Sequence, residues 1–233
     1  MTEKIAIITA AGQGVGAAIA RELAEVGYKL ALMSNSGGAV TLAEELGGIA
    51  ITGSVTNPDD LKNLVDAAME KYDRVDAVVT NTGHPPKGDI LAISDEDWHT
   101  GLDLLILPVA RLARLVTPIF EKQGGGAMVN ISTFSAFEPS PSFPVSSALR
   151  AGLAGYVKLY ADRYAEVGIR MNNVLPGFMD NYPSTPEIVE KIPMKRYARV
   201  QEVAKTVRFL LSEDAGYITG QNIRVDGGIT RGL

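Results

Sequence analysis

The chain has 233 residues and a formal net charge of −5, and 46% of its residues are hydrophobic and 21% charged. This balance lies close to the globular average, so it excludes a disordered chain and predicts one domain over residues 1–233. The sequence has no cysteine and two histidines, which excludes disulfides, thiolate nucleophiles and cysteine-bound metals, and we expect no metal site.

Short apolar runs alternate with longer amphipathic segments along the chain. The apolar runs predict strands at Lys4–Thr9, Lys29–Met33, Ile49–Thr52, Asp76–Thr80, Ala127–Ser132, Arg170–Leu175 and Asn222–Val225. The amphipathic segments predict helices at Gly14–Val26, Val40–Leu46, Pro58–Tyr72, Asp95–Lys122, Val145–Val167 and Gln201–Ser212. This alternation predicts an α/β fold with a doubly wound parallel sheet of about seven strands and helices on both faces. Ligands of such sheets bind at the carboxyl ends of the strands.

A glycine-rich turn follows the first strand. Gly12, Gly14 and Gly16 let the backbone turn tightly and approach a phosphate, and the helix that follows presents free N–H groups to an anion. Because a strand precedes the turn and a helix follows it, the context predicts a dinucleotide site. The residues that we expect to contact the cofactor in this turn are Thr9, Gln13, Gly14, Val15 and Gly16.

Four motifs in order resemble the short-chain dehydrogenase/reductase family, which has a Rossmann-type fold. They are the turn from Thr9 to Gly16, Asn81-Thr82-Gly83, the Pro176-Gly177 turn, and the segment from Tyr217 through Gly228. Ala10 departs from the pattern, because the family usually has a glycine there. The resemblance covers essentially the whole chain and implies a nicotinamide cofactor and a small-molecule substrate.

The end of the second strand bears on the choice of cofactor. An acid at this position signals NAD, but the chain reads Ser34-Asn35-Ser36, with neither an acid nor a base. Gln13 stands where users of NADP often carry a base, and we expect NADP(H), weakly preferred over NAD(H). The resemblance implies further cofactor contacts at Ser54, Val55, Asn81, Gly83, Arg150, Pro176, Gly177, Met179 and Asn181.

The four catalytic positions of that family are occupied by other residues here. The resemblance implies a Ser, a Tyr as general acid or base, a Lys and a supporting Asn. By register, Thr133 stands at the Ser position, Ser146 thirteen residues on at the Tyr position, and Arg150 four further at the Lys position. Leu105, seven residues after Trp98, stands at the Asn position.

These replacements change the proton chemistry that the resemblance implies. Thr133 keeps a hydroxyl. The resemblance implies that the Asn holds a water molecule that links the Lys to solvent, and Leu105 has no polar group to hold that water. Ser146 is shorter and far less acidic than a phenol, whose pKa is ~10. Arg150 stays charged and relays no proton, but it can bond ribose hydroxyls and stabilise a developing anion. A slip of one residue puts Ser147 at the Tyr position, which supplies no phenol either.

Further candidates follow other strand ends. His84 titrates near neutrality, and we place it in the catalytic set, with a solvated loop histidine as the alternative. Asp180 and Tyr182 follow the Pro-Gly turn and are candidates for facing the substrate. Residues 181–195 are expected to form a short substrate lid. Three side chains beside the catalytic segment are candidate walls of an apolar pocket: Phe134, Phe137 and Phe143.

Partners and location follow from what the sequence lacks. The basic residues form no cluster that favours nucleic acid, and the apolar stretch 102–120 is interrupted by charges, which predicts a buried helix and no membrane span. The apolar run near the start is too short for a secretory signal, so we expect a cytoplasmic protein. The resemblance implies a homo-oligomer, either a dimer or a tetramer.

Three functions stay open on the sequence. The first is an NAD(P)(H)-dependent oxidoreductase acting on a carbonyl, alcohol or imine, with Thr133, Ser146, a bound water or His84 handling the proton. The second is a nucleotide-binding protein without redox turnover. The third is a lyase or isomerase that uses Arg150 to hold an anionic substrate.

Overall fold

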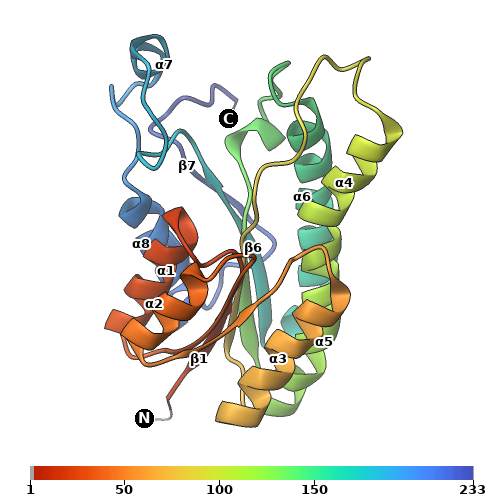
Figure 1. Ribbon diagram of the computed structural model, residues 1–233, viewed down its shortest axis with the longest axis vertical. Helices are drawn as coiled ribbons and strands as arrows, with labels where there is room; N and C mark the ends of the chain where they lie inside the picture. Colours follow the sequence, from red (N-terminus) through yellow and green to blue (C-terminus); the bar gives the residue numbers. More distant parts are fainter. Residues whose placement is uncertain (1–2, 233) are drawn as a thin grey trace.

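A parallel sheet runs through the middle of the computed structural model, which describes residues 3–232 (Figure 1). Its seven strands have the order β3-β2-β1-β4-β5-β6-β7. The chain reverses direction across the sheet between β1 and β4, which defines the switch point where such folds bind ligands. The strands are β1 (Ile5–Ile8), β2 (Lys29–Ser34), β3 (Ile49–Thr52), β4 (Ala77–Thr80), β5 (Gly126–Ile131), β6 (Ile169–Pro176) and β7 (Asn222–Val225).

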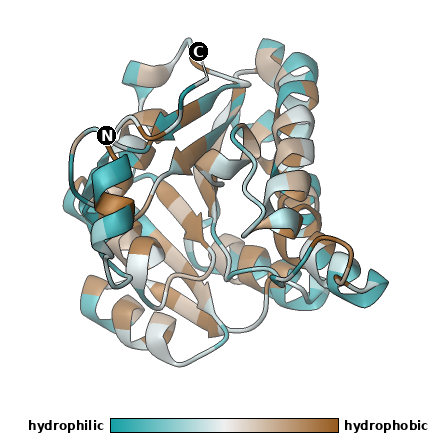
Figure 2. Ribbon diagram, turned by 90° about the horizontal axis from the view of Figure 1, so that it is seen from above, coloured by the Kyte–Doolittle hydropathy of each residue, from teal (hydrophilic) through white to brown (hydrophobic). Residues whose placement is uncertain are grey.

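Helices cover both faces of the sheet, as the alternating pattern predicts. One buried cluster joins the sheet to α1, α2 and α8, and a second joins it to α3, α5 and α6. Figure 2 shows apolar residues on the central strands and polar residues on the outer faces of the helices. The α-helices are α1 (Gly14–Glu25), α2 (Gly38–Leu46), α3 (Pro58–Tyr72), α4 (Asp95–Leu105), α5 (Leu107–Gln123), α6 (Pro144–Tyr164), α7 (Pro186–Lys191) and α8 (Val200–Leu211).

The single long helix predicted over Asp95–Lys122 is wrong, because the chain forms two helices there. Ile106 lies between α4 and α5 with φ −109° and ψ −49°. Pro108 causes the break, since proline has no N–H to donate to the carbonyl four residues earlier and its ring clashes with that carbonyl. The apolar pattern continues across the break, so the periodicity of apolar residues does not reveal that the helix ends at Leu105.

A row of buried polar side chains crosses the last four strands. Thr80 donates to Asn130 at 2.7 Å, Asn130 to Asn173 at 3.0 Å, and Asn173 to Asn222 at 2.8 Å. Each pair is also directly opposite in the strand register. A slip of any strand would leave buried amides without partners, so the row fixes the register of the strands whose ends carry the site.

Two local features bear on the site. Ser94 accepts a hydrogen bond from the backbone N–H of Asp97 and so caps the start of α4. The segment after β6 contains the short helix α7, which projects from the top of the molecule in Figure 1. Over the described residues 3–232, every helix is too short or too polar to cross a membrane.

Candidate functional site

The glycine turn packs too tightly at Gly16 for any side chain. A Cβ there would lie 2.3 Å from the carbonyl oxygen of Ala10 and 2.9 Å from the amide nitrogen of Asn81. Gly14 has φ +56°, in the left-handed region that favours glycine. Ala10 also has a positive φ, +47°, where the family pattern usually has a glycine. The turn therefore brings bare backbone to the start of α1, the cradle that a pyrophosphate requires.

Thr9 and Asn81 join the ends of β1 and β4. The Thr9 hydroxyl donates to the Asn81 carbonyl at 2.7 Å and accepts from the Asn81 N–H at 2.9 Å. The Asn81 side chain donates to the Ala10 carbonyl at 3.2 Å. Because these groups are engaged with one another, Thr9 and Asn81 hold the glycine turn against the loop after β4. The neighbouring Thr82 hydroxyl is buried and has no partner among the described residues.

The ends of β2 and β3 carry the expected adenosine side of the site. The Ser34 hydroxyl donates to the Ser36 carbonyl at 2.6 Å and accepts from the Ala39 N–H, so it shapes the turn. Asn35 and Ser36 are exposed beside it and free to meet a ribose or a 2′-phosphate. After β3, Val55 is buried, and the Ser54 N–H donates to Asp60 at 2.8 Å.

The segment after β5 and the start of α6 bring three predicted residues to the same edge. Thr133 follows β5 and accepts a hydrogen bond from the Ser135 N–H at 3.4 Å, which begins a short 3₁₀ turn. Ser146 lies half-buried in the first turn of α6. Arg150 is one turn further along, so the two side chains share one helix face. Leu105, at the end of α4, is buried.

Arg150 is a buried cation without a counterion. Its side chain is 8% exposed, and its Nη1 donates to the carbonyl of Ile131, the last residue of β5, at 2.6 Å. Its Nε has no partner, and no carboxylate among residues 3–232 forms an ion pair with it. Burial lowers the pKa of Arg150 to about 10, so the guanidinium stays charged at neutral pH. An unpaired buried charge is costly, and positions that keep one are commonly ligand sites.

The segment after β6 returns over the glycine turn. The Gly177 N–H donates to the Val225 carbonyl at 3.0 Å, and a Cβ at Gly177 would lie 2.9 Å from the backbone of Asp226. Met179 forms a bridge with Ala198. The Asn181 side chain lies beside Gly14, 3.3 Å from where a Cβ would stand. Pro176, Met179 and Asn181 thus lead from the end of β6 to the glycine turn.

His84 and Tyr182 meet across the top of the site. His84 Nε2 lies 2.7 Å from the Tyr182 hydroxyl, and the ring centroids are 5.4 Å apart. Burial lowers the pKa of His84, and the charges of Lys87 and Arg150 lower it further. The sequence places both residues after strand ends, but their contact depends on the path of two loops. Asp180 faces another way, because its carboxylate accepts from the Val200 N–H at the start of α8.

The three phenylalanines proposed as pocket walls lie in different environments. The Phe134 ring packs against Phe178 at 5.6 Å, and Phe178 in turn packs against Tyr197. Phe143 lies under the Lys87 ammonium, and Phe137 under the Arg224 guanidinium. Phe134 therefore packs against Phe178, which was not among the predicted pocket walls, and has no ring contact with Phe137 or Phe143 among the described residues. The place of Phe178 directly after Pro176-Gly177 is the signal that marks it.

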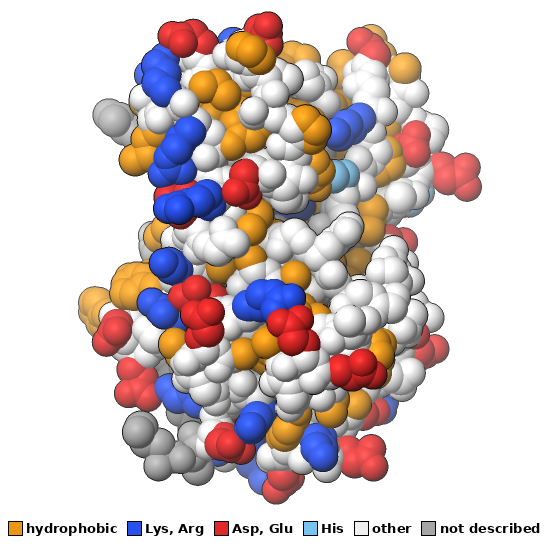
Figure 3. All heavy atoms as spheres, turned by 60° about the vertical axis from the view of Figure 1, so that its left-hand side comes forward, with side chains coloured by type: hydrophobic (Ala, Val, Ile, Leu, Met, Phe, Trp, Pro, Cys, Tyr) orange, Lys and Arg blue, Asp and Glu red, His pale blue; other side chains and the backbone are white. Residues whose placement is uncertain are grey.

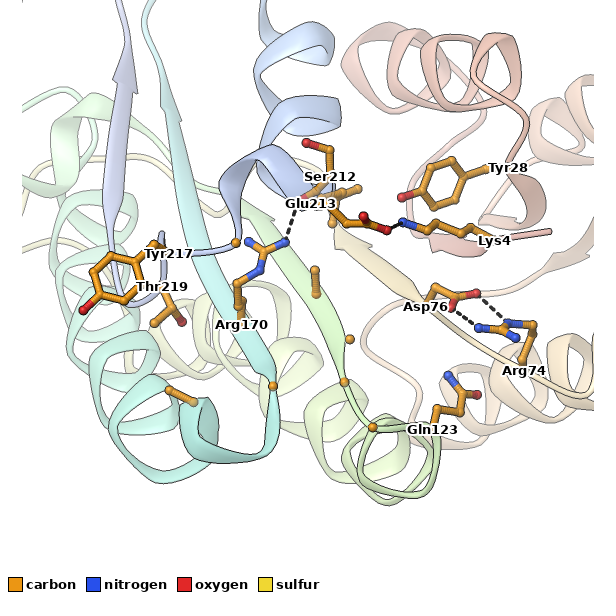
Figure 4. Close-up of a pocket in the computed structure, with 18 residues that line it drawn as sticks. Lys4, Tyr28, Arg74, Asp76, Gln123, Arg170, Ser212, Glu213, Tyr217 and Thr219 are labelled. Atoms are coloured by element: carbon orange, nitrogen blue, oxygen red, sulfur yellow. Dashed lines mark hydrogen bonds and ion pairs between the residues drawn. The ribbon is translucent and has the colours of Figure 1, made fainter. Parts of the chain in front are cut away.

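A sizeable hollow of the described chain lies away from this edge. Its volume is about 700 Å³, and its lining includes Lys4, Arg74 and Arg170 at the opposite edge of the sheet (Figure 4). Lys4 pairs with Glu213, Arg74 pairs with Asp76, and Arg170 donates to backbone carbonyls at the end of α8. Because these charges are already satisfied, this hollow is a structural junction. The surface at the carboxyl edge is also hollowed, below the lobe that carries α7, and charges of both signs are interspersed around it (Figure 3).

Comparison with known proteins identifies the family. The sequence model described as enoyl-(acyl carrier protein) reductase matches residues 9–230. A 3-oxoacyl-[acyl-carrier-protein] reductase of Synechocystis sp. is 34% identical over 242 residues, covering 98% of each chain. The human dehydrogenase/reductase SDR family member 4 is 33% identical, covering 98% of this chain and 88% of its own. The chain belongs to the short-chain dehydrogenase/reductase family.

A solved member of the short-chain dehydrogenase/reductase family shares the whole fold. The L-sorbose reductase from Gluconobacter frateurii, crystallised with NADPH and L-sorbose, matches with a TM-score of 0.92 at 27% identity. The match covers 100% of this chain and 98% of that one. These relatives are named as reductases, which supports an oxidoreductase and confirms the resemblance that the motifs suggested.

Proposed function

We propose that this chain is an NAD(P)(H)-dependent reductase of a small carbonyl or iminium compound, with Ser146 and Arg150 in place of the family's Tyr and Lys. The observation that carries the proposal is the cradle at Gly16, where bare backbone faces the edge that also holds a buried, unpaired guanidinium. A dinucleotide and its substrate fit both features. The phosphates bind to the bare backbone of the glycine turn, and the guanidinium suits ribose hydroxyls or a negative charge that develops on the substrate.

Each part of the site has a separate task in this proposal. Gly14, Val15 and Gly16 hold the phosphates at the start of α1, and Pro176, Gly177 and Met179 lie toward the nicotinamide. When bound, a reduced nicotinamide supplies the hydride. Two further tasks belong to side chains of this chain.

The first task is to hold the substrate oxygen. Thr133 lies two residues after the end of β5, and its hydroxyl engages only the weak contacts of the short turn after it, at 3.4 and 3.5 Å. We assign it the hydrogen bond to the oxygen of the substrate. The second task is to stabilise negative charge on that oxygen, and the fixed guanidinium of Arg150 suits it because it is buried and oriented by Ile131.

NADP(H) is the weakly preferred cofactor. The exposed Asn35 and Ser36 carry no carboxylate to repel a 2′-phosphate. The solved relative was crystallised with NADPH, which agrees with this preference. We expect Asn35→Asp to lower the affinity for NADPH about 10-fold or more and to leave NADH binding within about threefold. Asn35→Ser is the matched control, and equal losses for both nucleotides in Asn35→Asp would contradict the preference.

A substrate panel tests the function. The unaltered chain is incubated with NADPH or NADH and a set of ketones, aldehydes and preformed iminium ions, and loss of reduced nicotinamide absorbance is followed. We expect turnover with at least one substrate class. Tight nucleotide binding without any turnover would instead support the nucleotide-binding alternative. Product formation without change in absorbance would support a lyase or isomerase.

Two further features belong to the proposal. Residues 181–195 form a substrate lid, because this exposed segment with α7 lies beside the glycine turn through Asn181. The chain assembles as a dimer or tetramer through the outer faces of α5 and α6, where Leu159 is 71% exposed. Light scattering tests the second point, and a monomer at micromolar concentration would contradict it.

A further inference from the structure

The contact between His84 and Tyr182 spans the end of β5. His84 follows β4, Tyr182 follows β6, and β5 lies between those two strands in the sheet. A contact between these two loops therefore passes over the carboxyl end of β5, where Thr133 begins the next segment. The 2.7 Å separation of His84 Nε2 and the Tyr182 hydroxyl thus brings a phenol and an imidazole together at the carboxyl edge of the sheet, near the end of β5 to which we assign the substrate oxygen.

Other contacts tie the same two loops to the walls of the site. Lys87, three residues after His84, lies over the Phe143 ring, just before α6 begins. Phe134 after β5 packs against Phe178 after β6. The charge of Arg150 also reaches the His84 imidazole. These contacts join the loops after β4, β5 and β6 to one another and to the start of α6.

Burial, with the nearby charges second to it, lowers the pKa of His84 and so favours a neutral imidazole near pH 7. Lys87 from its own loop and Arg150 from α6 are both cationic, and Tyr182 is the group in hydrogen-bond contact. Among residues 3–232 no carboxylate forms an ion pair with His84. A neutral imidazole is a far weaker acid than a phenol, so the phenol is the better proton donor of the two.

We propose that Tyr182 is the catalytic acid of this site and that His84 holds its hydroxyl and links it to solvent. The inference rests on the proposed function. It supplies, from the loop after β6, the phenol that α6 lacks at Ser146. Both rings are accessible to solvent in part, with Tyr182 49% exposed, so protons can enter from outside.

The proton and electron balance is complete with a reduced nicotinamide dinucleotide as the reductant. The substrate carbon receives the hydride and its electron pair, and the C=O π pair moves to the oxygen, which takes the Tyr182 proton. The phenolate then takes the proton from His84 Nε2 while His84 Nδ1 takes one from water, and the hydroxide left is neutralised by the solvent, so that one solvent proton is consumed in each turnover. An iminium substrate needs no such proton, because hydride addition alone gives the neutral amine.

That difference supplies the test. We expect Tyr182→Phe to lower kcat for a ketone by about 100-fold or more and to leave the rate for a preformed iminium ion within about threefold. His84→Gln should lower ketone turnover by about 10-fold and flatten its pH dependence. Nucleotide affinity should stay unchanged in both variants. Tyr217→Phe and His99→Gln are the matched controls, because Tyr217 lines the hollow at the opposite edge and His99 is exposed on α4.

A measurement without nucleotide gives a second readout. The ¹⁵N resonance of His84 Nε2, followed by NMR, should shift in Tyr182→Phe and stay in place in Tyr217→Phe. Full ketone activity in Tyr182→Phe would overturn the inference while leaving the proposed function intact. Equal losses with ketone and iminium would also overturn it, since they would mark a structural role. An unaltered chain without turnover on either class would overturn the proposed function and this inference together.

Discussion

The Arg150 guanidinium donates to the carbonyl of Ile131 at 2.6 Å, and this bond ties the second turn of α6 to the last residue of β5. It leaves the Nε atom unpartnered and the positive charge unpaired. The chain thus keeps an unpaired buried cation at the carboxyl edge of the sheet at a cost in stability, which is the arrangement expected where a ligand completes a site.

Replacing Arg150 should change nucleotide affinity and the free energy of unfolding in different directions. Under the proposed function, Arg150→Met removes the charge-assisted hydrogen bonds that we assign to it with a bound nucleotide, each worth about 1.5–3 kcal/mol, so we expect affinity to fall about 10-fold or more. The free energy of unfolding should stay equal or rise, because an unpaired buried charge is lost. Calorimetric titration with NADPH and urea unfolding measure the two effects. Arg150→Lys, which keeps the charge, is the control, and a destabilised Arg150→Met with full affinity would show a structural role.

The pH dependence of His84 follows from its neighbours. Burial, Lys87 and Arg150 lower its pKa below the ordinary value of 6.5. The unfolded chain therefore binds this proton more readily, so the contribution of His84 to stability is full above about pH 6.5 and is lost as the pH falls through the lowered pKa. NMR titration should show the pKa of His84 rising in Arg150→Met and in Lys87→Met. His99→Gln assigns the two histidine signals, and an unchanged pKa in both variants would contradict the placement of His84.

The row of amides should carry a large share of local stability. Asn130→Ala leaves the Thr80 hydroxyl without its acceptor and the Asn173 Oδ1 atom without its donor, so we expect a loss of about 2–4 kcal/mol in the free energy of unfolding. Asn63→Ala, on the exposed face of α3, is the control and should change it by less than about 0.5 kcal/mol. Urea unfolding measures both variants. A loss below about 1 kcal/mol for Asn130→Ala would show that water replaces the missing bonds.

The glycine turn gives the sharpest contrast between two similar substitutions. Gly16→Ala places a Cβ 2.3 Å from the Ala10 carbonyl, so the turn must shift. We expect loss of nucleotide binding and a destabilisation of about 1–3 kcal/mol. Gly155→Ala, exposed on α6 with open space around it, should instead stabilise by about 0.5–1 kcal/mol and leave binding unchanged. Nucleotide binding that survives in Gly16→Ala would contradict the assignment of the cradle.

The sequence by itself determined the sheet, its helices on both faces and the edge at which to look for the site. Apolar runs of strand length between amphipathic segments admit few other folds, and the glycine turn between β1 and α1 marks a phosphate cradle through local backbone geometry. The limit of that local information is visible at Ile106, where Pro108 breaks a helix whose apolar pattern runs on without interruption.

Only the tertiary structure decided which side chains meet. Thr80, Asn130, Asn173 and Asn222 are far apart in the chain, and their alignment depends on strand register. His84 and Tyr182 are separated by 98 positions and meet because β4 and β6 flank the same strand. Local propensity sets where strands and helices begin. Contacts such as these depend on where the loops lie once the strands and helices have packed, and no short stretch of sequence encodes those positions.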